Sequence, residues 1–380
     1  MITMYCNNTK NNKVKGLFYG QAIGDCIGLC GEYMTKEEVR KKYQDVILFR
    51  SCDKIDDYHR ITWDIGDWTD DTDLFICIVK SIIDEKKYDS VAFAKYYYKW
   101  LNEGLIECND MTCHGAGNTT TIWWGDSYNI TDPERTGVRM LIYDPIRPFT
   151  NASNGSLMRI SILGALEDEE DIINSTIKNS LCSHANPECV ISCIFFVLLI
   201  SKLLKTNDLN YSDYVNIKND ILSKCKNILK KYCDELDIMI QYEVNLAKYD
   251  ADGDSIDNVI IENYKNYLKY DSDKIYNTLY KYSIKSSLSE LSLDTDIGYV
   301  FKTLSCALIS LEKMIYGETN FHKILSEIIL EGGDTDTNCA VAGALLGSYI
   351  GFNNIPSILV SDLLYSSYYD KLYKNFINLI

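Results

Sequence analysis

Apolar residues along this chain recur mainly at the spacing of an α-helix. One stripe comprises Leu74, Phe75, Ile78, Val79, Ile82 and Ile83, and a second comprises Leu304, Ala307, Leu308 and Leu311. Residues three and four positions apart share one face of a helix, so each stripe predicts an amphipathic helix with one buried side. No convincing run of alternating apolar and polar residues indicates a strand. The pattern therefore predicts an all-α fold.

Glycine recurs at every fourth position in two segments. The first contains Gly16, Gly20, Gly24 and Gly28, and the second contains Gly343, Gly347 and Gly351. Glycine inside a helix costs about 1 kcal/mol relative to alanine, and close packing of helix backbones compensates for that cost. We therefore expect core helices at residues 15–28 and 338–351, which would bring residues 25–32 near residues 332–338. Loop glycines placed by chance are the alternative. A membrane-packing stripe is excluded because Gln21 and Asp25 interrupt the first segment.

We expect residues 1–14 to form an N-terminal tail and residues 15–380 to form a single compact domain. Within it, residues 203–296 are rich in Lys, Asn, Asp and Tyr but carry no cluster of reactive groups. We interpret them as peripheral helices, because the motifs on either side resemble parts of one site. The longest apolar stretch, residues 189–200, is too short to span a bilayer and predicts a central buried helix.

The charge balance limits the classes of partner. The chain has 54 acidic and 38 basic residues and a net charge of −16, which opposes broad binding to nucleic acid or to an anionic membrane. A small anionic substrate remains compatible if metal ions or backbone amides supply local positive potential. The first residues lack the apolar segment of a secretory signal, so the 14 cysteines are expected to be reduced and the protein to be cytoplasmic.

Two loops rich in Asp and Thr precede predicted helices. Residues 64–73 contain five aspartates, and residues 331–338 repeat the design with Asp334, Thr335, Asp336 and Thr337. A helix N-terminus offers about half a positive charge, which favours one or two acids but not five. One such loop alone is also typical of a helix cap with a solvated acidic first turn. Two loops without His or Cys favour all-oxygen ligation of Mg²⁺, Mn²⁺ or Ca²⁺ over Zn²⁺.

Five motifs together resemble the ADP-ribosylglycohydrolase family, which includes the dinitrogenase reductase-activating glycohydrolases and the crystallin J1 relatives. They are Gly24-Asp25-Cys26-Ile27-Gly28 followed by Glu32, Trp68-Thr69-Asp70-Asp71-Thr72, Asn154-Gly155-Ser156-Leu157-Met158-Arg159, Ser183-His184, and Gly332-Gly333-Asp334-Thr335-Asp336-Thr337. They occur in the order found in the family and cover residues 15–356. The resemblance implies a compact all-α fold, two Mg²⁺ (or Mn²⁺) ions, and removal of ADP-ribose from a modified protein or small molecule.

The resemblance also implies roles for individual residues. The metal ligands would be Thr69, Asp70, Asp71, Asp334, Asp336 and Thr337. The catalytic residues would be Glu32, Asp70 and Asp336, with Glu32 as a mobile acid/base. The substrate-binding residues would be Asn118, Asn154, Gly155, Ser156, His184 and Tyr299. From the residues alone, Asn154-Gly155 is equally an ordinary turn, His184 a structural histidine, and Tyr299 a core tyrosine.

One position departs from the family pattern and leaves the substrate open. Several bacterial relatives carry an acid two residues before the glycine that is Gly117 here, and this chain has Gly115 at that position. An arginine linkage therefore does not transfer directly. Two rival functions are a catalytically silent ADP-ribose-binding protein and a two-metal phosphohydrolase. We favour the glycohydrolase because none of the expected ligands is missing and both Glu32 and the Asn-Gly-Ser loop are present.

Overall fold

The computed structural model describes residues 2–44, 46–117, 119, 130–249, 255–317 and 320–379. Its α-helices are α1 (Ile2–Gly28), α2 (Lys36–Lys42), α3 (Asp70–Glu85), α4 (Ser90–Glu103), α6 (Pro133–Tyr143), α7 (Glu169–Leu181), α8 (Pro187–Lys205), α9 (Tyr211–Tyr249), α10 (Ser255–Tyr264), α11 (Ser272–Ser283), α12 (Val300–Ile315), α13 (Phe321–Ile329), α14 (Thr335–Ile350), α15 (Ser357–Asp362) and α16 (Ser366–Ile377). The described residues form no strand, only two isolated β-bridges. The all-α prediction is confirmed.

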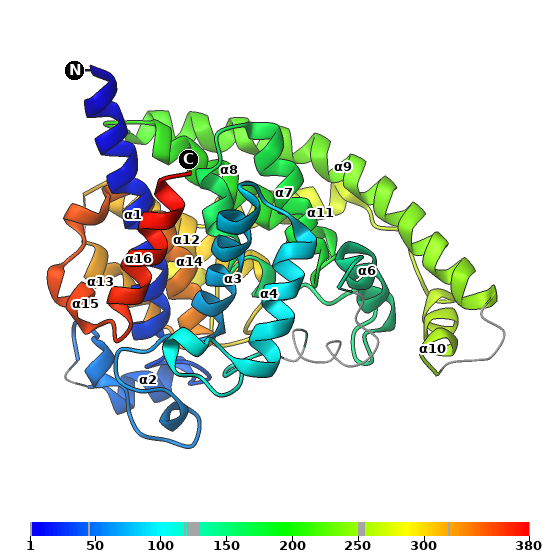
Figure 1. Ribbon diagram of the computed structural model, residues 1–380, viewed down its shortest axis with the longest axis horizontal. Helices are drawn as coiled ribbons and strands as arrows, with labels where there is room; N and C mark the ends of the chain where they lie inside the picture. The colour runs from blue at the N-terminus through cyan, green and yellow to red at the C-terminus, as the bar shows by residue number, and fades with distance from the viewer. Residues whose placement is uncertain are drawn as a thin grey trace.

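Helices α1 and α14 lie side by side in the interior of the fold (Figure 1). A Cβ atom on Gly20 would lie 2.0 Å from the carbonyl oxygen of Gly343, and one on Gly347 would lie 2.0 Å from the carbonyl oxygen of Gly16. Such distances leave no room for any side chain, so the two backbones are in direct contact. The predicted packing of the two glycine stripes is confirmed.

Helix α8 is the central helix of the core. It is long and apolar enough to cross a bilayer by composition, with a mean hydropathy of 2.1, but 89% of that window is buried inside the protein. Pro187 begins the helix and Asn186 caps it by accepting a hydrogen bond from the Glu188 amide, a usual start for a helix. The buried helix expected at residues 189–200 is present.

Residues 2–14 and the segment that follows α8 are both helical in the structure. Helix α1 begins at Ile2, so residues 2–14, which we expected to form an N-terminal tail, are part of this helix. Val14 is buried, and Lys13 donates a hydrogen bond to the carbonyl oxygen of Leu203 at 2.8 Å.

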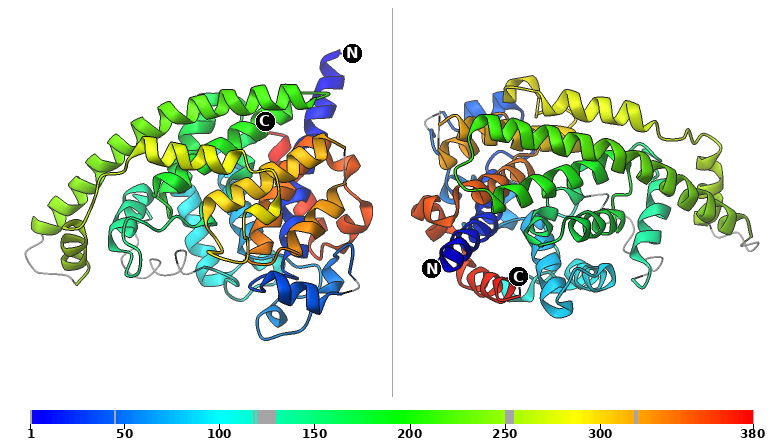
Figure 2. Two further views of the ribbon diagram at one scale, coloured as in Figure 1. Left: turned by 180° about the vertical axis from the view of Figure 1, so that it is seen from behind. Right: turned by 90° about the horizontal axis from the view of Figure 1, so that it is seen from above.

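Helix α9 runs along the outside of the fold and projects beyond it, with α10 near its far end (Figures 1 and 2).

Candidate metal centre and substrate loops

Three helix ends meet at one place because α1 and α14 are in backbone contact. A Cβ atom on Gly28, the last residue of α1, would lie 2.6 Å from the Cα atom of Asp336 in the first turn of α14. Helix α3 also begins here, with Thr69 as its N-cap and Asp70 as its first residue. The two Asp/Thr loops therefore face each other through their helix N-termini, although Thr69 and Asp336 are 267 residues apart in the sequence.

Asp25 joins α1 to the first turn of α3. Its Oδ1 accepts hydrogen bonds from the amide and hydroxyl of Thr69 at 3.0 and 2.8 Å, and its Oδ2 accepts from the amide and hydroxyl of Thr72 at 2.9 and 2.6 Å. Burial raises the pKa of Asp25 to about 6, although these hydrogen bonds oppose the shift. Asp25 is not among the site residues predicted from the sequence. Its four hydrogen bonds make it the residue that orients the Asp70-Asp71 turn.

Several carboxylate oxygens converge with too few hydrogen-bond donors between them. Thr69 Oγ1 lies near three of these oxygens, which are Asp25 Oδ1 at 2.8 Å, Asp71 Oδ2 at 3.1 Å and Asp336 Oδ2 at 3.5 Å. A hydroxyl has a single hydrogen, so it can satisfy only one of them. In the described part of the chain, the buried Oδ1 atoms of Asp71 and Asp336 have no hydrogen-bond partner at all. Facing lone pairs of this kind need a cation.

Two groups of acids have the spacing of cation sites. One contains Asp25, Asp71 and Asp336, the other contains Glu32, Asp334 and Asp336, and in each group one oxygen per residue lies within 4.8 Å of the others. The groups share Asp336, which would therefore be a ligand common to both sites. All donors are oxygen atoms, which suits Mg²⁺ or Mn²⁺. The residues present thus fit the metal that the sequence resemblance implies.

The electrostatics of the acids agree with this interpretation. Burial raises the pKa of Asp70, Asp71 and Asp336 well above the usual carboxyl range, and the negative charge of neighbouring acids raises each pKa further. No lysine or arginine among the described residues forms an ion pair with these three side chains. Without a cation, the acids repel one another when ionised.

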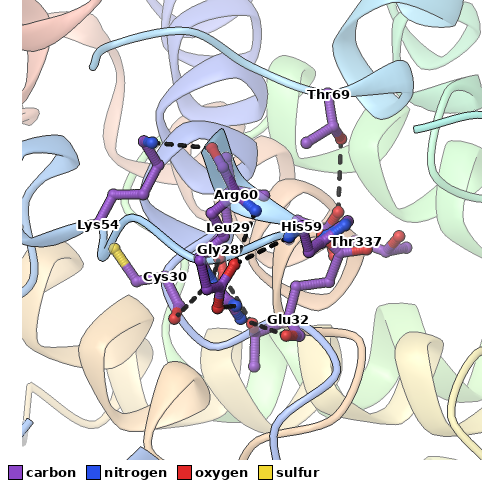
Figure 3. Close-up of polar contacts among 12 residues, drawn as sticks. Gly28, Leu29, Cys30, Glu32, Lys54, His59, Arg60, Thr69 and Thr337 are labelled. Carbon is purple, nitrogen blue, oxygen red and sulfur yellow. Dashed lines mark hydrogen bonds and ion pairs between the residues drawn. The ribbon is translucent and has the colours of Figure 1, made fainter. Parts of the chain in front are cut away.

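Glu32 follows α1, and Figure 3 shows it beside His59 and Arg60. Its Oε2 lies 2.6 Å from His59 Nε2. The buried guanidinium of Arg60 holds the backbone of the same turn, because its Nε donates to the carbonyl oxygen of Leu29 at 2.8 Å and its Nη2 donates to that of Glu32. Lys54 donates to the Arg60 carbonyl oxygen at 2.8 Å. Residues 54–60 therefore form a clamp on Glu32 that no sequence motif indicated.

A backbone bridge fixes Glu32 beside the second Asp/Thr loop. The Tyr33 amide donates to the Gly333 carbonyl oxygen at 2.8 Å, and the Gly333 amide donates to the Met34 carbonyl oxygen at 2.7 Å. Gly333 has a φ of 85°, which a side chain would strain. A cavity of about 580 Å³ opens here, and Glu32, Tyr33 and His59 line part of it. The candidate acid/base thus borders both the acids and open space.

The Asn154-Gly155-Ser156 loop reaches the same acids from the other side. The Asn154 side chain donates to Asp334 Oδ2 at 2.8 Å and to Thr303 Oγ1 at 3.0 Å. The backbone amide of Asn154 donates to the Gly298 carbonyl oxygen at 2.9 Å, and the β-bridge between Ser153 and Tyr299 continues this pairing. Asn154 therefore contacts Asp334 directly, Gly155 follows it in the chain, and Tyr299 is paired with the residue before Asn154.

Gly155 has no room for a side chain, whereas Ser156 points into the core. A Cβ atom on Gly155 would lie 2.8 Å from the His184 ring. Ser156 is fully buried, and its Oγ accepts a hydrogen bond from Ser180 at 3.0 Å and lies 3.4 Å from Cys193 Sγ. The structure thus brings Gly155 and His184 together but turns the Ser156 hydroxyl away from the loop surface.

The other predicted substrate residues have different surroundings. Tyr299 is half-buried, with ring centroids of Tyr282 and Phe301 at 5.8 and 5.6 Å. Asn118 lies outside the described residues. Gly115 has a φ of 80°, and a Cβ atom there would lie 3.1 Å from both Asp70 Oδ1 and the Trp63 ring. The position at which relatives carry an acid is therefore tightly enclosed beside Asp70.

Comparisons with known proteins agree with this geometry. The sequence profile of the family described as ADP-ribosylglycohydrolase matches residues 7–380. An ADP-ribosylarginine hydrolase of Serratia proteamaculans is 22% identical over 361 residues, covering 91% of this chain and 73% of that protein. A protein of Acanthamoeba polyphaga mimivirus, named as an ADP-ribosyl glycohydrolase, is 21% identical over 94% of this chain and 92% of its own. A solved structure titled ADP-ribosylglycohydrolase-related protein complex superposes with a TM-score of 0.62 at 18% identity, covering 98% of this chain and 99% of that one.

Proposed function

Since the chain belongs to the ADP-ribosylglycohydrolase family, we propose that it is a metal-dependent hydrolase that cleaves the C1″ glycosidic bond of ADP-ribose on a modified protein or small molecule. The convergence of Asp71 and Asp336 carries the proposal. Each of them has a buried oxygen without a hydrogen-bond partner, and the two side chains bring carboxylate oxygens within 4.8 Å of each other at two helix N-termini. Such a site is costly to keep in a folded protein unless it binds cations.

Two divalent ions, Mg²⁺ or Mn²⁺, would be held by Thr69, Asp70, Asp71, Asp334, Asp336 and Thr337. When bound, they would supply Lewis-acid polarisation and lower the pKa of water at the ribose. Asp25 already uses both of its oxygens to orient Thr69 and Thr72, so it positions the ligands.

Glu32 would transfer the proton in the hydrolysis. Cleavage of a ribosyl bond passes through an oxocarbenium-like state, in which a carboxylate can take a proton from the attacking water or protonate the leaving group. Glu32 borders both the acids and the adjoining cavity. The contact with His59 at 2.6 Å and the Arg60 clamp would hold its carboxylate there.

The Asn154-Gly155 turn would receive the diphosphate of ADP-ribose. Gly155 leaves room for the His184 ring beside this turn, and the Asn154 side chain donates to Asp334. Backbone amides of such a turn can bind phosphate oxygens. These contacts would place the ribose end of the ligand near the ions.

The proposal is tested with a panel of ADP-ribosylated substrates analysed by mass spectrometry, with Mg²⁺ and with a chelator. Linkages to arginine, serine, acetate, a nucleic-acid end and polymeric ADP-ribose would all be included. We expect metal-dependent release of intact ADP-ribose from at least one of them. Release of AMP instead would support a two-metal phosphohydrolase, and binding of ADP-ribose without turnover would support a silent binding protein.

A further inference from the structure

Arg159 is a buried cation behind the Asn154-Gly155-Ser156 loop, and the mechanism above does not use it. Its guanidinium nitrogens donate to uncharged oxygens, namely Asn179 Oδ1 at 3.1 Å, the carbonyls of Gly155 and Asn179 at 3.1 Å each, and Ser183 Oγ at 2.7 Å. The guanidinium also lies over the rings of Phe93 and Tyr97. No carboxylate in the described part of the chain forms an ion pair with it. Its positive charge therefore remains uncompensated next to the loop.

Ser183 connects Arg159 to the His184 ring. The Ser183 hydroxyl is buried and accepts a hydrogen bond from Arg159 Nη2, so its own single hydrogen needs another acceptor. His184 Nδ1 lies 2.8 Å from Ser183 Oγ. The hydroxyl hydrogen therefore points at Nδ1, and a neutral ring must then carry its proton on Nε2.

The surroundings keep the His184 ring neutral. Burial and the charge of Arg159 lower the pKa of His184 to about 3. A ring with its proton on Nε2 and a donor at Nδ1 can donate a hydrogen bond but cannot take a proton from water. This distinguishes a donor from a general base, the two roles that the sequence left open.

Ser153 is the next member of the chain of hydrogen bonds. His184 Nε2 lies 3.0 Å from Ser153 Oγ, so its N–H donates to that hydroxyl oxygen. The Ser153 hydrogen is then directed elsewhere. Among the described residues, Thr119 Oγ1 lies 3.5 Å from Ser153 Oγ, a long contact in which either hydroxyl could donate. Ser153 is half-buried and precedes Asn154, whose side chain donates to Asp334. Its hydroxyl therefore lies in the loop that we propose to receive the diphosphate.

We infer that Arg159 and Ser183 are positioning residues that fix His184 as an Nε2–H donor, and that Ser153 in turn presents its hydroxyl hydrogen to a phosphate oxygen of the ligand. The identity of the ligand, a diphosphate, rests on the proposed function. The direction of the hydrogen bonds from Arg159 through Ser183 and His184 to Ser153 does not rest on the proposed function, because it follows from contacts within the protein.

The first test reads the His184 tautomer directly. Ring ¹⁵N chemical shifts would be recorded on the full-length protein with labelled histidine, and His184→Gln would assign the signal among the four histidines. We expect a neutral Nε2–H ring from pH 7 down to pH 5. Ser183→Ala should lose the single tautomer, and Ser183→Thr, which keeps the hydroxyl, should restore it. An Nδ1–H ring, or a ring that becomes protonated near pH 6, would overturn the inference.

Ser310→Ala is the matched control. It also removes a buried serine hydroxyl, but that hydroxyl donates within its own helix to the Cys306 carbonyl oxygen at 2.7 Å. It should leave the His184 signal unchanged. Thermal unfolding of all variants would show that each one folds.

The second test measures the ligand contact. Calorimetric titration with ADP-ribose in Mg²⁺ should give a Kd about threefold to tenfold higher for Ser153→Ala and for Ser183→Ala, the usual worth of one hydrogen bond. The double variant should bind ADP-ribose with about the same Kd as the single variant that binds it more weakly, since both substitutions affect the same contact. KM should rise more than kcat falls. An unchanged Kd in both single variants would overturn the role of Ser153. If the wild-type protein bound no ADP-ribose, the proposed function would fail, while the ring tautomer would still decide the hydrogen-bond direction.

Discussion

At the scale of single residues, Asp336 is the acid common to both candidate cation groups. We predict that Asp336→Asn abolishes turnover and leaves the fold nearly intact. The amide keeps the size of the side chain but removes a negative charge, which weakens binding of a hard cation far more than packing. Activity would be measured across a Mg²⁺ titration, with Asp234→Asn on the exposed side of α9 as control. Full activity of Asp336→Asn at low Mg²⁺ would mean that the loop is only a helix cap.

Glu32 has a separate role and a separate prediction. Glu32→Gln should slow hydrolysis by about 10²- to 10⁴-fold, because the amide cannot accept a proton, and should barely change the Kd of ADP-ribose. Single-turnover kinetics beside calorimetry would separate the two effects. A parallel loss of affinity would instead indicate a metal ligand or a substrate gate, and unchanged turnover would remove Glu32 from the mechanism.

The sequence motifs identified the aspartates that lie together in the structure, but not the residues that position the site around them. Asp70, Asp71, Asp334 and Asp336 could be selected because unusual local composition marks each loop. His59 and Arg60 could not, since their contacts with Glu32 and Leu29 depend on how a long connecting segment folds back. Ser156 shows a further limit. It lies in a 3₁₀ turn with Asn154, where neighbouring side chains point in different directions, and its hydroxyl lies in the core.

At the scale of helices, the contact between α1 and α14 should be sensitive to a single methyl group. We predict that Gly20→Ala destabilises the protein by about 1–3 kcal/mol or more, because its Cβ would lie 2.0 Å from a backbone oxygen that cannot move alone. Denaturant unfolding would measure the change. Gly117→Ala is the control, since among the described residues no atom lies within 4 Å of a Cβ there. Equal stability of the two variants would contradict close backbone packing.

The same helices show why the fold was predictable in its centre and less so at its edge. Glycine in a helix is unfavourable, so its repetition carried information about packing. Residues 2–14 are mostly polar and gave no comparable signal, yet they extend α1. Lys13 reaches the end of α8 by a contact that only the folded chain creates.

At the scale of the whole molecule, the acid cluster should couple stability to pH and to divalent ions. In the folded protein the pKa values of Asp70, Asp71 and Asp336 are raised, whereas an unfolded aspartate has a pKa of about 3.9. Between these values the folded state binds more protons than the unfolded state. The free energy of unfolding of the metal-free protein should therefore fall as the pH rises above about 4.

Divalent cations should reverse this trend, because they bind the deprotonated acids of the folded state. At a free Mg²⁺ concentration about 100 times its Kd, the free energy of unfolding should increase by about 2.7 kcal/mol at neutral pH. This increase should become smaller towards pH 5, because protons compete with the metal for the acids. Thermal unfolding with chelator and with Mg²⁺ at several pH values would measure both effects. Asp336→Asn should be more stable than wild type in chelator at pH 7.5 and should lose most of the Mg²⁺ shift. The acids would not be a metal site if the stability of the wild-type protein increased with pH in chelator and did not change on addition of Mg²⁺.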